Sequence, residues 1–203
     1  MRRFISWAVI VIGNLLVLGL MFALSSQEPA LYFKETFDDP TLLSWEHSSG
    51  ARVVNQVLRV EPGHAIFYPP IGNFSLTVRA RLLGSGALLI AYCAREQDSY
   101  VFRFGTGSIS LIHEYAAHEV ELAAAPISIP PNTWVTIHII YIEGNHVISL
   151  DGRRVLAAYD PYFRPPGGIV FSNPPGEGAA GEFDDLEVRG DDPDQYLPDR
   201  PGE

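Results

Sequence analysis

The chain has 203 residues, of which 47% are hydrophobic and 19% are charged, and these fractions are typical of a globular protein with one main core. Arg2 and Arg3 account for two of its 14 Lys and Arg residues, so the remainder carries 12 bases against 24 acids, a formal charge of −12. That balance excludes nucleic acid and anionic membrane surfaces as preferred partners. Cys93 is the only cysteine, so no intramolecular disulfide can form.

The N-terminal segment, residues 1–24, is predicted to enter a membrane. Phe4 to Leu24 runs for 21 residues without a charge, and about 20 apolar residues span the ~30 Å hydrocarbon layer. A cleaved signal peptide has a shorter apolar core of roughly 7 to 15 residues, so the length favours an uncleaved anchor. Ala23-Leu24-Ser25 has the small-x-small form of a cleavage site, which leaves secretion as the alternative. The two arginines before the apolar run predict that the bulk of the chain lies outside the cytoplasm.

After a linker at residues 25–30, residues 31–189 are predicted to form one all-β domain. Short β-rich runs are separated by Gly, Pro, Asn and Asp, and no helical period extends over 10 to 12 residues. Hairpin turns are expected at 143–145 and 151–152, where Gly or Asn accepts a positive φ. The clearest predicted strands are 74–82, 87–94, 100–104, 108–115, 134–142, 147–159, 167–172 and 182–188.

These strands predict two packed antiparallel sheets, because each sheet must bury one apolar face. In the run 100–104 the three aromatic residues point to one side, and Val101 and Arg103 point to the other. Trp134 leads an apolar strand, so we expect it in the core. Residues 190–203 are acidic, rich in Pro and poor in aliphatic residues, and are predicted to be a disordered tail.

The order of these features resembles a known superfamily. "ETFDDPTLLSWE" is followed by "SYVFRFGTGSISLIHE", then by "PPNTWVTIHIIYIEGNHVISLDGRRV" and by "PPGGIVFSNPPGEGAAGEFDDLEV". Over residues 31–189 this resembles the concanavalin A-like lectin and glucanase superfamily, in its laminin-G-like and 3-keto-disaccharide hydrolase-like branches. The resemblance implies a jelly roll of two curved antiparallel sheets, often with a glycan-binding concave face and sometimes with a structural calcium. A fold does not assign an activity by itself.

The stretch "HEYAAHEVE", residues 113–121, has features of two different active sites. The zinc motif H-E-x-x-H needs two histidines four residues apart on a helix, whereas His113 and His118 are five apart in a run that alternates like a strand. Glucanases of the superfamily carry E-x-D-x-x-E, and Glu114 and Glu119 have that spacing, but Ala116 stands at the Asp position. We therefore expect a hairpin turn at 116–118 with the two glutamates on neighbouring strands, and keep a catalytic pair as the alternative.

A sugar offers an apolar C–H face and a rim of hydroxyls, so its site needs both apolar and polar side chains. Arg103 interrupts an aromatic strand on the face opposite the core and is a candidate ligand contact. The other candidate ligand-binding residues are Tyr92, Arg95, His113 and Glu114.

A structural Ca²⁺ is a further hypothesis. The tripeptide Phe-Asp-Asp occurs at 37–39 and again at 183–185. The superfamily resemblance implies that the first and last strands are neighbours, which would gather Glu35, Asp38, Asp184 and Asp185. Calcium takes six to eight oxygen ligands. The alternative is that Asp38 shapes a turn and that the later pair keeps an exposed strand charged.

Together these observations predict a membrane-tethered, extracytoplasmic module that binds a glycan or another cell-surface polymer without catalysis. A glycoside-processing hydrolase of the same fold is one alternative. A protein-binding adhesion or structural module is the other.

Overall fold

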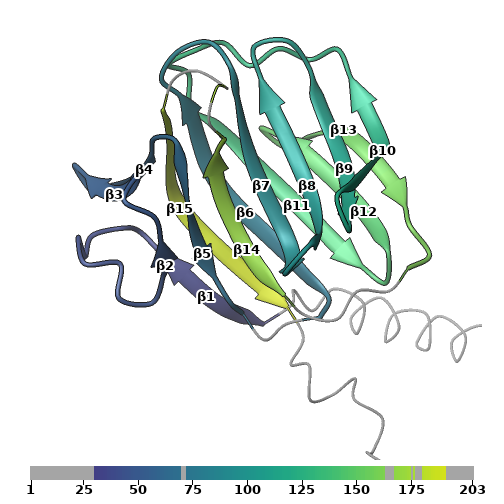
Figure 1. Cartoon of the computed structure of the whole chain (residues 1–203), viewed down its shortest axis with the longest axis horizontal. Coiled ribbons are helices and arrows are strands. Elements are labelled where there is room, and N and C mark those ends of the chain that lie inside the picture. The colour runs from purple at the N-terminus through teal and green to yellow at the C-terminus, as the bar shows by residue number, and fades with distance from the viewer. Residues whose placement is uncertain (1–29, 70–71, 163–166, 175, 177–179, 191–203) are drawn as a thin grey trace, which may run out of the picture.

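Alternating strands build two antiparallel sheets that pack face to face in the computed structural model (Figure 1). The structure describes residues 30–69, 72–162, 167–174, 176 and 180–190. The predicted anchor or signal at 1–24, nearly all of the predicted linker and the tail at 191–203 therefore lie outside the described residues. Within the described ranges there is no helix long and apolar enough to cross a membrane. The predicted all-β, two-sheet class is confirmed.

Sheet A contains eight strands, with β6 and β15 near its centre. Its order is β13 (Arg153–Tyr159), β12 (Asn145–Leu150), β11 (Val135–Ile142), β6 (Phe74–Leu82), β15 (Gly181–Gly190), β4 (Val57–Val60) and β3 (Ala51–Val54), with β1 (Leu31–Glu35) also paired to β15. The first and last strands are neighbours, as the resemblance implied.

Sheet B contains seven strands and supplies the other layer. Its order is β10 (His118–Ala125), β9 (Ile109–Tyr115), β8 (Asp98–Gly105), β7 (Ala87–Arg95), β14 (Gly168–Asn173), β5 (Gly63–Phe67) and β2 (Glu46–His47). Four of these strands, β7 to β10, follow one another along the chain as hairpins, whereas β14 joins from far away in sequence.

The core lies between the sheets and follows the period-two alternation of each strand. In β6, Phe74, Leu76 and Val78 are buried while the residues between them are partly exposed. In β8 the three aromatic residues Tyr100, Phe102 and Phe104 point inward and are fully buried, as predicted. Burying one such side chain stabilises the fold by about 1.5 to 3 kcal/mol.

The two tryptophans among the described residues occupy different environments. Trp45 is 6% exposed and packs among the rings of Phe33, Phe37, Phe67 and Phe171. Trp134 lies outside sheet A, where the guanidinium carbon of Arg81 is 4.6 Å from its ring centroid. The prediction that Trp134 is in the core was wrong, because Val135 is the inward residue and alternation directs its neighbour outward.

The hairpin turn expected at 151–152 is confirmed, and the one expected at 143–145 is present but shorter, because Asn145 already belongs to β12. Glu143-Gly144 and Asp151-Gly152 each have two residues at positive φ, the geometry of the turns that match strand twist. Ala116 and Ala117 form a third such turn, with φ values of 47° and 66°. His118 pairs with Tyr115 and belongs to β10, so the turn is one residue shorter than predicted.

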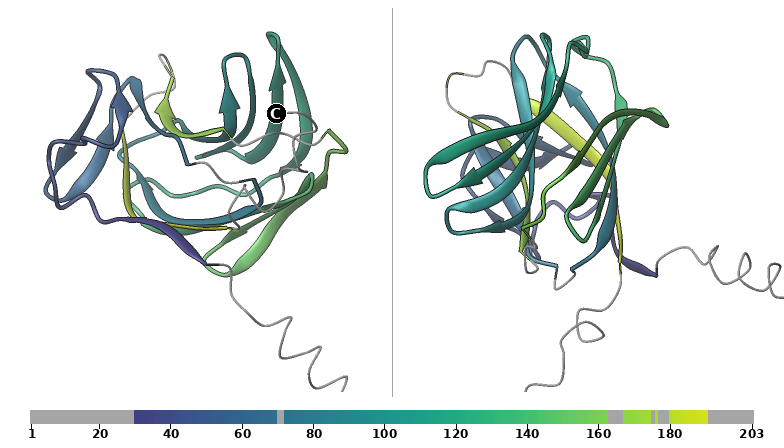
Figure 2. Two further views of the ribbon diagram at one scale, coloured as in Figure 1. Left: turned by 90° about the horizontal axis from the view of Figure 1, so that it is seen from below. Right: turned by 90° about the vertical axis from the view of Figure 1, so that its right-hand side faces the viewer.

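Both sheets curve in the same sense. Figure 2 shows sheet A on the outside of the curve and sheet B on the inside. The outer face of sheet B is therefore the concave face of the molecule.

Candidate functional site

A row of aliphatic side chains crosses the outer face of sheet B. The strand register aligns Ile66 of β5 with Val170 of β14, Val170 with Ala91 of β7, and Ala91 with Val101 of β8. Val101 aligns in turn with Ile112 of β9. Neighbouring strands lie about 4.8 Å apart, so this aliphatic row extends for roughly 19 Å.

Polar side chains accompany the aliphatic row on both sides. One neighbouring row aligns Ser172, Leu89, Arg103 and Ser110 across four strands. The opposite row aligns Ser99, Glu114 and Glu119 across β8, β9 and β10. The alternation of each strand and the register between strands therefore build an aliphatic strip between two rows that are polar except at Leu89.

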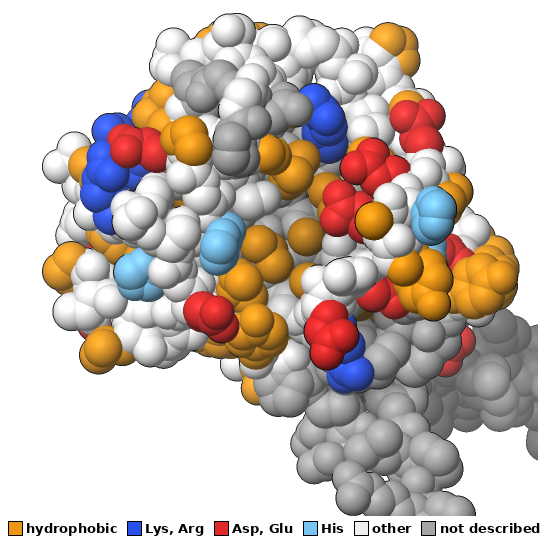
Figure 3. All heavy atoms as spheres, viewed as in Figure 1, with side chains coloured by type: hydrophobic (Ala, Val, Ile, Leu, Met, Phe, Trp, Pro, Cys, Tyr) orange, Lys and Arg blue, Asp and Glu red, His pale blue; other side chains and the backbone are white. Residues whose placement is uncertain are grey.

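Four residues of the aliphatic row form the floor of a hollow of about 850 Å³, called here the sheet B hollow: Ile66, Val170, Ala91 and Val101. Figure 3 shows it in the middle of this face, with hydrophobic side chains at its base and acidic side chains gathered on the β9–β10 side. Its rim includes the 95–99 turn between β7 and β8 and the tip of the β9–β10 hairpin. The charged lining residues are Arg95, Glu96, Asp98, Glu114 and Glu119.

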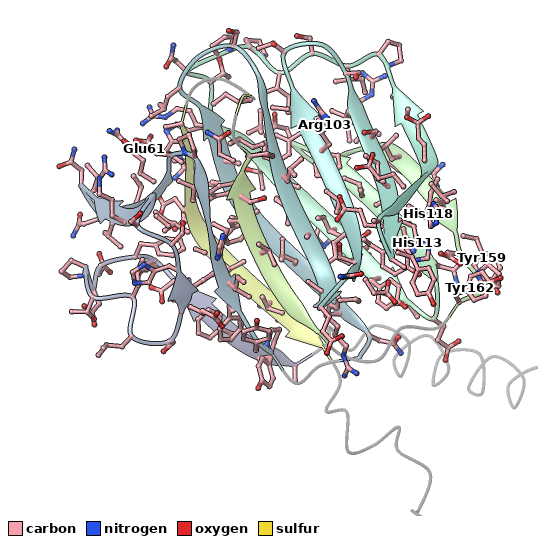
Figure 4. The ribbon with its side chains drawn as sticks, viewed as in Figure 1. Glu61, Arg103, His113, His118, Tyr159 and Tyr162 are labelled. Atoms are coloured by element: carbon pink, nitrogen blue, oxygen red, sulfur yellow. The ribbon has the colours of Figure 1, made fainter. Side chains whose placement is uncertain are left out.

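Three of the predicted ligand-binding residues lie on this face. Arg103 is exposed on the outer side of β8, beside the hollow (Figure 4). Arg95 ends β7 after a bulge at Cys93, whose φ is 52°, and lines the hollow. Glu114 also lines it, and the Ser99 hydroxyl donates to its carboxylate over 3.2 Å.

The other two predicted residues lie between the sheets, so they do not reach the concave face. Tyr92 is fully buried, its hydroxyl is hydrogen-bonded to Nδ1 of His146 at 2.8 Å, and burial raises its pKa. Tyr92 lies two residues after Ile90 and four after Leu88 in β7, so its side chain points inward with theirs. In β9 the side chain of His113 likewise points inward with those of Ile109 and Leu111, and it is 9% exposed. These two side chains are corrected from ligand contacts to core positions.

His113 belongs to a polar network at one end of the core. Its Nδ1 is 3.0 Å from the Asp160 carboxylate and its Nε2 is 3.4 Å from Asp98. The Tyr100 hydroxyl is 3.2 Å from the Asp160 carboxylate and 3.1 Å from the backbone carbonyl oxygen of Tyr162, both of which can accept its hydrogen bond, and Figure 4 labels His113 and Tyr162 at this end. The network ties sheet B to the segment after β13, and through Asp98 it reaches the rim of the hollow.

A second, smaller hollow of about 500 Å³ lies on the outer face of sheet A. It is lined mainly by β6, β11 and the end of β15. Two of its charged residues, Glu187 and Arg189, form an ion pair with each other. Because sheet A is on the outside of the curve (Figure 2), this second hollow lies on the convex face.

Several solved structures are similar to this two-sheet architecture. A carbohydrate-binding module, CBM66, from Bacillus subtilis matches with a TM-score of 0.63 and 13% identity, covering 74% of this chain and 98% of the module. A Bacillus subtilis protein of unknown function with a galectin-like fold matches with a TM-score of 0.63 and 14% identity, covering 80% of this chain and 97% of that one. A non-specific endo-β-1,3(4)-glucanase of family GH16 matches with a TM-score of 0.61 and 12% identity, covering 80% and 91%.

The chain has a concanavalin A-like fold. The superfamily resemblance of the sequence is thereby confirmed at the level of fold, which is all that identities below 15% show. No family model matches the chain, and no curated protein matches its sequence.

Within this concanavalin A-like sandwich, Glu114 and Glu119 are directly opposite each other on neighbouring strands. Residues opposite in an antiparallel pair point to the same face, with Cα atoms about 4.5 to 5.5 Å apart. The sequence predicts them on neighbouring strands beside a hairpin turn, and this arrangement is what the structure has. They are near the tip of the β9–β10 hairpin, and both line the rim of the hollow.

The four carboxylates of the calcium hypothesis lie near the β1–β15 pair. The Glu35 carboxylate accepts the Phe37 amide at 2.8 Å, and Asp185 is paired with Arg79 at 3.1 Å. Burial raises the pKa of Asp184, and the negative charges of Asp185 and Asp38 add to the effect, while its own hydrogen bond with the Asp185 amide and the charge of Arg79 oppose it. Among the described residues no group of three His, Cys, Asp or Glu side chains is arranged to hold a metal. A structural Ca²⁺ stays a prediction.

The aliphatic floor of the candidate site is not predicted from the sequence. Val101 had been placed opposite the aromatic residues of β8, but its partners Ile66 and Val170 come from strands far away in sequence. The sequence signal that could have indicated these residues is the period-two alternation of each strand, because each floor residue is next to a residue of the core.

Proposed function

We propose that this protein is a carbohydrate-binding module and that the sheet B hollow is its glycan site. The observation that carries the proposal is the aliphatic row flanked by two polar rows on the concave face. A sugar ring can lay its C–H face on such a strip while its hydroxyls meet the flanking serine, arginine and carboxylate groups. CBM66 and the GH16 glucanase, with the same fold, are carbohydrate-binding and carbohydrate-cleaving proteins by name.

The N-terminal segment is part of this proposal. An uncleaved anchor at residues 1–24 holds the module at the outer side of a membrane, facing a glycan or another cell-surface polymer. Tethering raises the effective concentration of a weak binding site near its polymer. Cleavage of the segment would instead release the module, and the mass of the mature N-terminus distinguishes the two.

Blocking the floor tests the site. Ala91 is 9% exposed at the centre of the aliphatic row, and Ala91→Trp would fill the hollow. We expect at least a tenfold loss of affinity, about 1.4 kcal/mol, for any polysaccharide that retards the full chain in affinity electrophoresis. Ala157→Trp, an exposed alanine on edge strand β13 of the other sheet, is the matched control and should bind like the wild type.

Two results would contradict the proposal. Retardation of the wild type by no polysaccharide in a broad panel removes glycan binding. Equal binding by Ala91→Trp, with its fold intact by circular dichroism, moves the site away from the sheet B hollow.

The opposed glutamates favour a second candidate function, glycoside hydrolysis. A retaining enzyme needs two carboxyl groups about 5 to 5.5 Å apart, and the β9–β10 register places Glu114 and Glu119 at neighbouring positions of one face. If the pair is catalytic, Glu114→Gln or Glu119→Gln should abolish the release of reducing ends from a bound polysaccharide. Glu143→Gln, which changes an exposed acid in a turn of the other sheet, should leave the rate unchanged. If the wild type binds a polysaccharide but releases no reducing ends from it, the protein is a binding module without catalysis.

A further inference from the structure

The rim of the sheet B hollow carries an excess of negative charge. Four carboxylates, from Glu96, Asp98, Glu114 and Glu119, line it with one arginine, Arg95. Glu121 extends the acidic side, because it is aligned with Ile112 at the end of the aliphatic row. A concave surface lined by one sign of charge concentrates ligands of the opposite sign. The formal charge of −12 beyond the N-terminal segment acts in the same direction.

The arrangement of Glu114 and Glu119 adds an independent reason to expect a cation. Like charges directly opposite on neighbouring strands destabilise the pair. Within the described residues neither glutamate forms an ion pair, and Glu114 accepts a hydrogen bond from the neutral hydroxyl of Ser99. Glu114 is also half-buried, so water screens its charge incompletely. A positive group placed between the two carboxylates would relieve this repulsion.

The position of the two glutamates relative to the floor limits what that positive group can belong to. Ser99, Glu114 and Glu119 form the row next to Val101 and Ile112. A ligand lying on the aliphatic row therefore presents its edge to the carboxylates. A ring with an apolar face and an ammonium group on its rim satisfies both surfaces at once, whereas a sulfated or uronic acid polymer would bring like charge to the rim.

We infer that the hollow selects glycans with free amino groups, such as polymers of glucosamine, over their N-acetylated and acidic counterparts. This rests on the proposed function, since it names the sugar class for the same site. Glu114 and Glu119 are then the specificity-determining residues, and the aliphatic row supplies contacts that both forms of the sugar share.

The test compares two oligosaccharides of equal length, a glucosamine hexamer and an N-acetylglucosamine hexamer, by calorimetry with the full chain in mild detergent. We expect the amino form to bind at least about tenfold more tightly, which corresponds to about 1.4 kcal/mol. Raising the salt from about 50 to about 500 mM should reduce this preference, because exposed charges are screened over a shorter distance. The double variant Glu114→Gln, Glu119→Gln should bind both hexamers alike.

Glu143→Gln is the matched control, because Glu143 is an exposed acid in a turn of the other sheet. It should keep the preference of the wild type. Equal binding of both hexamers by the wild type, or tighter binding of the acetylated one, overturns the amino-sugar class but leaves a glycan site. Binding of no glycan overturns the proposed function as well. Binding of polylysine as tightly as the amino hexamer shows attraction by charge alone and also overturns the inference.

Discussion

Gly144→Ala is expected to lower the free energy of unfolding by roughly 3 to 5 kcal/mol, from left-handed strain and overpacking together. Gly144 closes the β11–β12 hairpin at a φ of 80°, and a Cβ built there lies 2.0 Å from the carbonyl oxygen of Asp160. The same two residues are joined by a backbone hydrogen bond, in which the Asp160 amide donates to Gly144 over 2.9 Å. The backbone cannot separate at this point without losing that bond.

Gly152→Ala separates the two contributions. Gly152 has a φ of 77° in the β12–β13 hairpin, but a Cβ there meets no atom within 4 Å. It should therefore cost only about 1 to 2 kcal/mol, the left-handed strain of an L-residue. Chemical denaturation of both variants measures the difference. Equal losses would mean that the close approach of Asp160 to Gly144 adds nothing to the cost of a Cβ at this position.

The contact at Gly144 also positions the polar network at the end of the core. Asp160 accepts from Tyr100 and lies against His113, and His113 in turn contacts Asp98 on the rim of the hollow. A chain segment displaced by Gly144→Ala would move Asp160 away from both. Loss of glycan affinity in this variant, beyond that in Gly152→Ala, would show that the network holds the 95–99 turn in its binding geometry.

The fold could be predicted from the sequence because its information is local. Alternation in β6 and β8 specified which side chains face the core, and the Glu143-Gly144 and Asp151-Gly152 pairs specified tight hairpins. Such patterns need only period-two geometry and the freedom of a residue to take a positive φ. They carry through to the two-sheet architecture because each sheet has one apolar face.

The site was predicted only in part, because it is assembled from strands that are not consecutive. Arg103, Arg95 and Glu114 were proposed from their own strands and lie on the concave face, but their role in ligand binding stays a prediction, and the floor requires the pairing of β14 with β7 and β5. His113 and Tyr92 were chosen for their chemistry although strand parity directs both inward. For these two residues the alternation of the strand predicts the direction of the side chain better than its chemical type does.

His146 is expected to make the fold sensitive to mild acid. It is 1% exposed on β12, and its ring centroid lies 4.3 Å from that of Tyr100. Burial lowers its pKa from 6.5 to about 4; the nearby His113 adds to the effect and Asp160 opposes it. Nδ1 is hydrogen-bonded to the Tyr92 hydroxyl, and Nε2 has no hydrogen-bond partner among the described residues. The folded protein therefore favours the neutral imidazole.

Proton linkage determines the direction in which the stability of the fold changes with pH. Between pH 6.5 and pH 4 the unfolded chain binds a proton at His146 that the folded chain does not, so stability falls as the pH is lowered through this window. A lowering of the pKa from 6.5 to about 4 corresponds to about 3 kcal/mol of stability, which is fully present above pH 6.5 and is lost near pH 4.

Urea unfolding at pH 7 and at pH 4 measures this loss of stability. His146→Gln keeps a group that can pair with Tyr92 but does not titrate, so it should lose about 3 kcal/mol less than the wild type over this range. His47→Gln, which changes an exposed histidine on β2, should follow the wild type. If His146→Gln loses as much stability as the wild type, acid acts on other groups, and the buried imidazole is not the sensor.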